Sequence, residues 1–218
     1  MPGTANNNLV AVLDTCVLFP ASLRDTLLRL AETPRQYIPK WSGRILAELT
    51  RNLESHRKLT PEKIAHLIGQ MERHFPEAEV TEYEKLIEVM TNHPKDRHVA
   101  AAAAQTGAQI IVTFNLKDFP AASLSDWAIE AQHPDEFLVN ILGNQPSAVV
   151  SKLRDQAKTI DRTLPELLRT HWEPEFLDSR QMWLQDSGSM SPGPGTRRLR
   201  REMCKTARSL CPIPAAGT

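Results

Sequence analysis

The stretch "VAVLDTCVLF", residues 10–19, is an apolar run that carries one carboxylate, Asp14. Its β-branched and aliphatic residues predict a buried strand. An ionised carboxylate taken out of water is costly, so Asp14 must be paired, protonated, bound to a metal or placed where the strand reaches solvent. Each of these alternatives requires particular partners elsewhere in the chain.

The segments that follow alternate between helical and strand patterns. A second buried strand is predicted at 108–114 and a further short strand at 127–131, and residues 78–90 are expected to hold a short strand followed by a helix. Helices are predicted over 22–32, 42–56, 60–75, 93–107, 133–142, 147–160 and 163–172. The predicted N-caps are Ser42, Thr60, Asp135 and Ser147, and Gly107 is a predicted C-cap. This alternation predicts an α/β fold, a three-layer sandwich with a central, mostly parallel sheet, plus C-terminal helices.

The chain length of 218 residues favours one main domain with an appendage. We predict a main domain over residues 1–133 and a helical extension over 134–185, which either pads the core or forms a small helical add-on. Residues 186–218 are rich in Ser, Gly, Pro and Arg and predict a basic, disordered tail. Arginines in such a tail are either solvated or contact phosphate.

Charge and cysteine content limit the class of protein. The 26 Lys and Arg residues balance 26 Asp and Glu residues, so the net charge argues neither for nor against a nucleic-acid partner. The three cysteines, Cys16, Cys204 and Cys211, form no CxxC pair, which favours a reducing compartment. The sequence shows neither a signal peptide pattern nor an apolar run long enough to span a bilayer. We therefore expect a cytoplasmic protein without membrane contact.

Polar residues follow two of the predicted strands. Asp14 comes at the end of the first strand, and Asn115 and Asp118 follow the strand at 108–114. Ligands of open parallel sheets bind beyond the carboxyl ends of the strands. If the two strands are neighbours, these three side chains converge on one edge of the sheet.

Two further carboxylates occur on predicted helices. Asp96 opens the alanine-rich helix, where it either complements the helix dipole or serves a site, and Glu48 borders an apolar helix face. Carboxylates gathered in one cleft raise one another's pKa unless a cation compensates them. Oxygen ligands without Cys or His suit Mg²⁺ or Mn²⁺, ions that support phosphoryl chemistry.

Taken together, the motifs resemble the PIN-domain ribonucleases, which include the VapC-type toxins of toxin-antitoxin pairs. The resemblance covers residues 9 to about 142. It depends on "VLDTCVLF", "ILAELTRNL", "HPKDRHVAAAA", "IIVTFNLKDFP" and "HPDEFL", in this order. It implies a compact α/β fold whose acids bind one or two divalent ions, Mg²⁺ or Mn²⁺, for RNA hydrolysis. It also implies an RNA substrate, a cognate antitoxin protein and a homodimer.

The resemblance carries over residue by residue. The family's first three acids match Asp14, Glu48 and Asp96, and its fourth position, Asp or Asn in a T-x-[DN] motif, matches Asn115. The predicted catalytic residues are Asp14, Glu48, Asp96 and Asp118, and the predicted metal ligands are these four with Asn115. Thr15 is expected to orient Asp14 or a metal-bound water, and Asn115 is a second substrate-contacting or orienting residue. The amide at Asn115 leaves the number of metal ions open.

Other readings of the same residues stay open. An aspartate-nucleophile phosphatase also places an Asp after its first strand, but that chemistry usually needs a carboxylate two residues later, where this chain has Cys16. Cys16 itself is predicted to be a small buried hydrophobe on the opposite face of the strand from Thr15. Arg97 and His98 are not assigned to the site, because residues next to a helical ligand point elsewhere. A non-catalytic RNA- or protein-binding module on the same fold is the remaining alternative.

Overall fold

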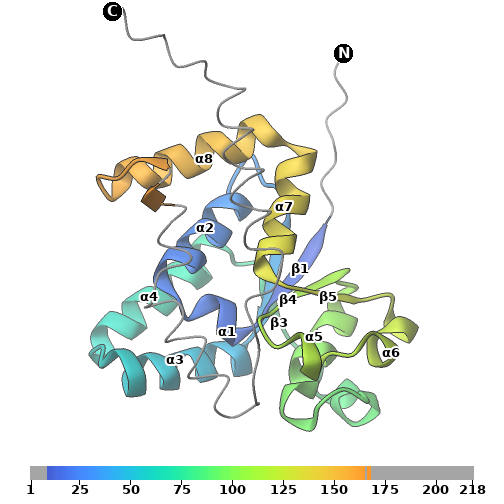
Figure 1. Ribbon diagram of the computed structural model, residues 1–218. Coiled ribbons are helices and arrows are strands. Elements are labelled where there is room, and N and C mark those ends of the chain that lie inside the picture. Colours follow the sequence, from blue (N-terminus) through green and yellow to red (C-terminus); the bar gives the residue numbers. More distant parts are fainter. Residues whose placement is uncertain (1–8, 165, 168–218) are drawn as a thin grey trace, which may run out of the picture.

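A five-stranded parallel sheet forms the centre of the computed structural model, which describes residues 9–164, 166 and 167 (Figure 1). The strands are β1 (Val10–Leu13), β2 (Ile38–Ser42), β3 (Glu79–Val80), β4 (Ile110–Val112) and β5 (Glu130–Gln132). Their order is β3-β2-β1-β4-β5, and every pair is parallel. The predicted α/β class and parallel sheet are confirmed.

The strand order places a topological switch between β1 and β4. The chain moves outward from β1 to β2 and β3, then returns to the other side of β1 to form β4 and β5. Val12 of β1 pairs with Lys40 on one side and Ile111 on the other. Switch points of this kind open a crevice beyond the carboxyl ends of the two strands.

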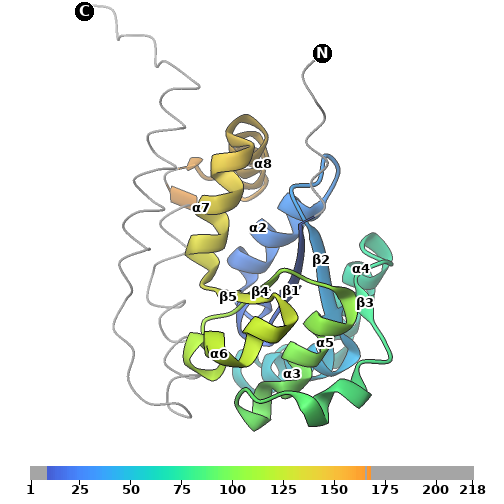
Figure 2. The ribbon, with the colours of Figure 1, turned by 90° about the vertical axis from the view of Figure 1, so that its right-hand side faces the viewer.

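Helices cover both faces of the sheet. They are α1 (Thr15–Leu18), α2 (Ala21–Ala31), α3 (Gly43–Arg57), α4 (Pro61–His74), α5 (Arg97–Thr106), α6 (Ala121–Leu124), α7 (Pro134–Asn144) and α8 (Pro146–Thr159). Short 3₁₀ segments are η1 (Glu84–Val89), η2 (Pro94–Asp96), η3 (Leu116–Asp118) and η4 (Ser125–Trp127). Figures 1 and 2 show α5 on one face of the sheet and α2, α7 and α8 on the other.

Local sequence signals explain several helix boundaries. The Ser42 hydroxyl accepts a hydrogen bond from Ile45 N, at 3.3 Å, and caps α3 as predicted. Gly107 ends α5 in the left-handed region, with φ 61°, also as predicted. The predicted caps Asp135 and Ser147 are wrong. Prolines occupy the first position of both helices, so α7 and α8 begin earlier, with His133 and Gln145 at their N-caps.

The opening stretch changes conformation at its carboxylate. β1 ends at Leu13, and α1 begins at Thr15 because the Asp14 carbonyl accepts hydrogen bonds from Val17 N and Leu18 N. Cys16 therefore lies on a helix, and the predicted strand alternation beyond Asp14 is wrong. The turn leaves Asp14 at the point where strand becomes helix.

Helix α5 packs its alanine-rich face against the sheet. Val99 and the four residues Ala100–Ala103 are fully buried, and α5 contacts strands β1 to β4 as well as η1. Alanine lets a helix approach its neighbours closely, because no side chain extends beyond Cβ. This close approach fixes the amino-terminal end of α5 near the sheet edge.

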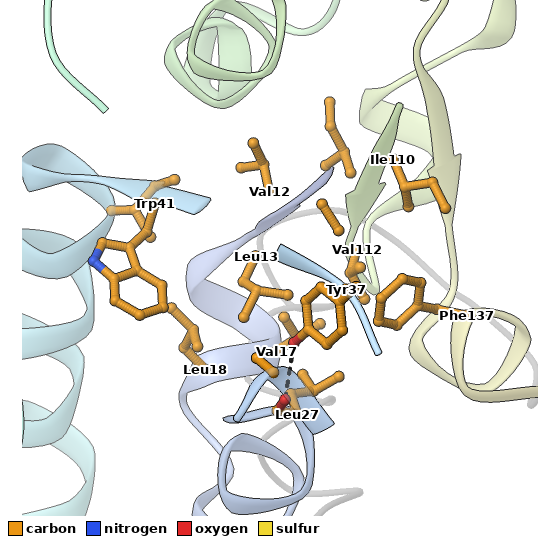
Figure 3. Close-up of a cluster of buried hydrophobic side chains, with 14 of the residues drawn as sticks. Val12, Leu13, Val17, Leu18, Leu27, Tyr37, Trp41, Ile110, Val112 and Phe137 are labelled. Atoms are coloured by element: carbon orange, nitrogen blue, oxygen red, sulfur yellow. Dashed lines mark hydrogen bonds between the residues drawn. The ribbon is translucent and has the colours of Figure 1, made fainter. Parts of the chain in front are cut away.

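Helices α7 and α8 share the hydrophobic core of the sheet. Phe137 of α7 packs edge-on against Tyr37, with ring centroids 4.9 Å apart, and the Tyr37 hydroxyl donates to the Leu27 carbonyl at 3.0 Å (Figure 3). Gln156 of α8 accepts a hydrogen bond from Thr26 of α2 at 2.8 Å. The two helices thus pad the core, one of the two arrangements expected for them.

The predicted domain boundaries stay predictions. The tail at 186–218 and the end of the helix expected at 163–172 lie outside the described residues. Within residues 9–164, 166 and 167, no helix has the length and apolar character needed to cross a bilayer.

Candidate metal centre at the sheet edge

The switch point between β1 and β4 gathers the predicted site residues. Asp14 directly follows β1, and Thr113 and Asn115 follow β4. The Asp14 N–H donates to the Val112 carbonyl at 3.1 Å, which extends the pairing of the two strands to the residue that carries the carboxylate. The carboxyl ends of neighbouring strands therefore converge as expected.

Asp14 is held by two neutral donors. Its Oδ2 accepts hydrogen bonds from Thr113 Oγ1 at 2.7 Å and from Cys16 Sγ at 3.1 Å. Asp14 is only 4% exposed, and this burial raises the pKa of its carboxyl group, although both hydrogen bonds oppose the rise. The protein thus orients this carboxylate without supplying a cation in direct contact with it.

Thr113 and Cys16 form a small network around Asp14. The Thr113 hydroxyl also accepts from Asn115 N at 3.0 Å, and Cys16 Sγ accepts from Phe114 N at 3.3 Å. Burial, followed by the negative charge of Asp14, raises the pKa of the Cys16 thiol well above its usual range. Cys16 is buried as predicted, but it is a neutral hydrogen-bond donor to Asp14 as well as a packing residue.

Glu48 lies on α3 in a different environment. Its Oε2 accepts from Thr15 Oγ1 at 3.3 Å, and its Oε1 lies 3.2 Å from His98 Nε2 and 3.5 Å from Arg44 Nε. The His98 ring nitrogen is close to the Glu48 carboxylate but is not aligned for a hydrogen bond, since neither ring nitrogen has a hydrogen-bond partner among the described residues. Thr15 thus orients Glu48, whereas Asp14 is oriented by Thr113 and Cys16.

These contacts set the charge of Glu48. Partial burial alone would raise the pKa of Glu48, but His98, Arg44 and the Thr15 hydroxyl outweigh it and lower that pKa. Glu48 is therefore ionised at neutral pH and already paired within the protein.

Asp96 lies at the junction of η2 and α5, only 8% exposed. Burial and then the negative charges of Asp14 and Asp118 raise the pKa of Asp96 to about 7, with Lys95 opposing the rise and Glu48 adding to it. The four predicted acids are thus close enough to act on one carboxyl group. Such mutual repulsion is the environment that a divalent cation relieves.

Asp118 brings a histidine to this cluster. The Asp118 carbonyl accepts a hydrogen bond from His93 N at 3.1 Å, and His93 Nδ1 lies 3.8 Å from Asp96 Oδ2. One potential ligand atom from each of His93, Asp96 and Asp118 lies within 4.8 Å of the other two. The donor set, carboxylates with one imidazole, fits a divalent ion.

Sequence reasoning missed three residues of this centre. Thr113 belongs to the T-x-N motif, but its bond to Asp14 joins residues 99 positions apart. His98 was set aside on helix geometry, yet Asp96 precedes the helix with φ −108° and ψ 8°, so the angular argument does not apply to this pair. His93 carries no sequence signal beyond its position beside Pro94.

Comparisons with known proteins agree with this geometry. A PIN domain family model matches residues 10–117. Over 60 residues the chain is 53% identical to "Putative ribonuclease VapC50" of Mycobacterium tuberculosis, an overlap of 28% of this chain and 36% of that protein. The aligned part is therefore little more than a third of the length of this curated relative. No solved structure matches the chain.

The family match spans β1 to η3 and contains Asp14, Glu48, Asp96 and Asn115, while Asp118 follows it directly. The matched segment includes the switch point between β1 and β4, where these residues converge. Residues 10–117, just under half of the chain, therefore match the PIN-domain family.

Proposed function

We propose that this protein is a metal-dependent endoribonuclease that uses Mg²⁺ or Mn²⁺ and forms the toxin component of a type II toxin-antitoxin pair. The observation that carries the proposal is the convergence of Asp14, Asp96 and Asp118 at the switch point, where burial and then the charges of Asp14 and Asp118 raise the pKa of Asp96 to about 7. The family match and the name of the VapC relative support the choice of RNA as substrate.

The proposed ligands are Asp14, Glu48, Asp96, Asn115 and Asp118. A divalent ion held by these oxygens would supply an activated water and would stabilise charge on the phosphodiester during hydrolysis. Thr113 and Cys16 fix the orientation of Asp14, and Thr15 fixes that of Glu48. Because these supports come from β4 and α1, the carboxylates are oriented before any substrate arrives.

Two arginines on α3 are placed to meet RNA beside these ligands. Arg44 and Arg51 flank Glu48 at 3.5 and 4.0 Å from its Oε1, and their side chains are 50% and 70% exposed. Exposed guanidinium groups bind phosphate oxygens through paired N–H donors. We propose that they hold the RNA backbone next to the metal centre.

The resemblance to VapC-type toxins also supports three further expectations. A cognate antitoxin protein would inhibit the RNA-binding edge of the sheet. The chain would form a homodimer. The toxin and its antitoxin would occur in the cytoplasm. Size-exclusion chromatography with light scattering tests the dimer, and co-purification with the product of an adjacent gene tests the antitoxin.

The nuclease proposal is tested with the purified full-length chain. We expect cleavage of single-stranded and structured RNAs in Mg²⁺ or Mn²⁺, and none in excess EDTA. Asp14→Asn should lower the cleavage rate at least ~100-fold, as expected when a metal ligand and charge-stabilising group is lost. The matched control is Asp155→Asn on α8, whose side chain is 62% exposed and remote from the sheet edge.

The outcomes separate the alternatives. Equal cleavage by wild type and Asp14→Asn, or no cleavage across varied RNAs in either ion, would overturn the nuclease proposal. Thermal stabilisation by metal without turnover would instead support a non-catalytic binding module. A phosphoryl adduct trapped on Asp14 would support phosphatase chemistry.

A further inference from the structure

We propose that His93 supplies an imidazole nitrogen ligand to the metal ion, together with Asp96 and Asp118, and that the centre therefore prefers Mn²⁺ over Mg²⁺. The inference rests on the proposed function, because it names an additional ligand and the preferred ion of the same site. The family motifs used above assign only carboxylates and an amide to this centre.

The distances place the His93 ring within reach of an ion. His93 Nδ1 lies 3.8 Å from Asp96 Oδ2, and the ligand atoms of His93, Asp96 and Asp118 all lie within 4.8 Å of one another. Ligands on opposite sides of an ion with bonds of about 2.1 Å are about 4.2 Å apart. Small side-chain rotations therefore bring the three atoms to coordination distance, and the half-exposed His93 side chain is free to make them.

Backbone hydrogen bonds hold these three residues together across two 3₁₀ segments, η2 and η3. The His93 N–H donates to the Asp118 carbonyl at 3.1 Å, and the Asp96 N–H donates to the His93 carbonyl at 2.9 Å. Pro94 opens η2 between His93 and Asp96 and fixes the backbone there. The approach of the imidazole to the two carboxylates is thus built into the backbone.

Asp96 gives an independent indication of a missing partner. It is only 8% exposed, yet within the described residues its carboxylate accepts no hydrogen bond, and His93 Nδ1 lies 3.8 Å from its Oδ2, beyond hydrogen-bond distance. A buried carboxylate left without hydrogen bonds is costly. Its Oδ2 faces His93 Nδ1, so the group that would satisfy it lies between these two residues.

The chemistry of the donor set selects the ion. Mg²⁺ requires near-ideal octahedral oxygen coordination and gives up its waters reluctantly. Mn²⁺ also favours oxygen ligands, but it belongs to the first-row divalent metals, which bind nitrogen ligands as well. A centre with one nitrogen among its oxygens is therefore better suited to Mn²⁺.

Pulsed electron paramagnetic resonance of Mn²⁺ bound to the full-length chain tests the assignment directly. A coordinated imidazole produces ¹⁴N modulation of the Mn²⁺ echo, and labelling with ¹⁵N-histidine must change that modulation. We expect the modulation in wild type, its loss in His93→Gln, and its retention in the control His66→Gln, an exposed residue of α4. Circular dichroism and thermal unfolding establish that the variants are folded.

Binding measurements provide the second readout. In His93→Gln, the Kd for Mn²⁺ should rise at least ~10-fold, a change typical of a lost group in a metal site, while the Kd for Mg²⁺ changes less. The inference is overturned if ¹⁴N modulation is absent in wild type, persists in His93→Gln, or disappears only in His98→Gln. An unchanged ratio of Mn²⁺ to Mg²⁺ affinity in His93→Gln would also overturn it.

The two proposals fail separately. RNA cleavage by wild type in Mg²⁺, combined with no nitrogen signal in Mn²⁺, overturns the His93 ligand and leaves the nuclease proposal standing. A nitrogen signal without cleavage of any RNA supports the ligand and overturns the nuclease.

Discussion

The acidic side chains at the sheet edge form two halves, one around Glu48 and one around Asp14 and Asp96, and the pKa values in the two halves shift in opposite directions. Glu48 is paired with His98, Arg44 and Arg51, and its pKa is lowered. Asp14 is held by the neutral groups of Thr113 and Cys16, and its pKa is raised.

Asp96 shares the behaviour of Asp14, with a pKa of about 7. Arg44 and Arg51 thus compensate the charge of Glu48, whereas the raised pKa values of Asp14 and Asp96 indicate that the described residues leave the negative charges of the aspartates largely uncompensated. We therefore expect an added cation to stabilise the protein most when it binds between Asp14, Asp96 and Asp118.

The largest expected effect is on the free energy of unfolding at pH 8, where mutations in the two halves should change it in opposite directions. Asp96→Asn should raise the free energy of unfolding of metal-free protein by up to about 4 kcal/mol, because its pKa rises from 3.8 to about 7 and one unit is worth about 1.4 kcal/mol. Glu48→Gln should lower that free energy, because the lowered pKa of Glu48 means that its ionised form stabilises the folded state at this pH. Urea unfolding of both variants measures the two signs.

The effect of Asp96 on the free energy of unfolding depends on pH. Below pH 4 Asp96 is protonated in both states, and as pH rises toward 7 the unfolded state ionises first, so the metal-free protein loses stability across this window. Asp96→Asn should remove that loss. If Asp96→Asn destabilised the protein at pH 8 as Glu48→Gln does, the contrast between the halves would be wrong.

Metal addition should give the next largest effect. At 100 times its Kd, a bound ion adds about 2.7 kcal/mol to the free energy of unfolding. The increase should be larger at pH 8 than at pH 5, where an ion must displace a proton from Asp96. Thermal unfolding with Mn²⁺, with and without EDTA, measures it, and an equal shift at both pH values would contradict the expectation.

Removing one support of Asp14 should have a moderate effect. Thr113→Val keeps the side-chain shape and deletes the 2.7 Å hydrogen bond to Asp14, which should cost about 1.5–3 kcal/mol at pH 8, the usual value for a bond to a charged group. Thermal unfolding provides the measurement. Thr159→Val, at an exposed hydroxyl of α8, is the control and should stay near wild type.

The smallest effect concerns the cations of the Glu48 half. Arg51→Ala should change the free energy of unfolding by less than about 0.5 kcal/mol, because its side chain is 70% exposed and its pair with Glu48 spans 4.0 Å. RNA binding should nevertheless weaken, with the salt dependence reduced by about one phosphate contact. Filter binding at several salt concentrations tests this. If the salt dependence of RNA binding were the same as in wild type, Arg51 would not contact the RNA.

The sequence predicted the fold and the acids but not their supports. Alternating strand and helix patterns give the parallel sheet, and the position of Asp14 after a strand gives the edge, because both signals are local. The helix at Thr15–Leu18 was missed because its residues continue the strand pattern, and hydrogen bonds to the Asp14 carbonyl determine its conformation.

The contacts of Thr113 and His98 were missed for another reason. They join residues that are distant in sequence, such as Asp14 with Thr113 and Glu48 with His98, and no local pattern encodes them. The same holds for His93, which meets Asp118 through a backbone hydrogen bond between loops.

The alanines of α5 have a consequence for the metal centre that they never touch. Ala100–Ala103 are fully buried where α5 packs against the sheet and against η1, and Asp96 lies at the amino-terminal end of the same helix. Alanine side chains end at Cβ, so they determine how closely α5 approaches the strands. This distance in turn determines the position of Asp96 relative to Asp14. We therefore expect a larger residue at any of these four positions to displace α5, to move Asp96 relative to Asp14 and so to change the affinity of the site for a metal ion.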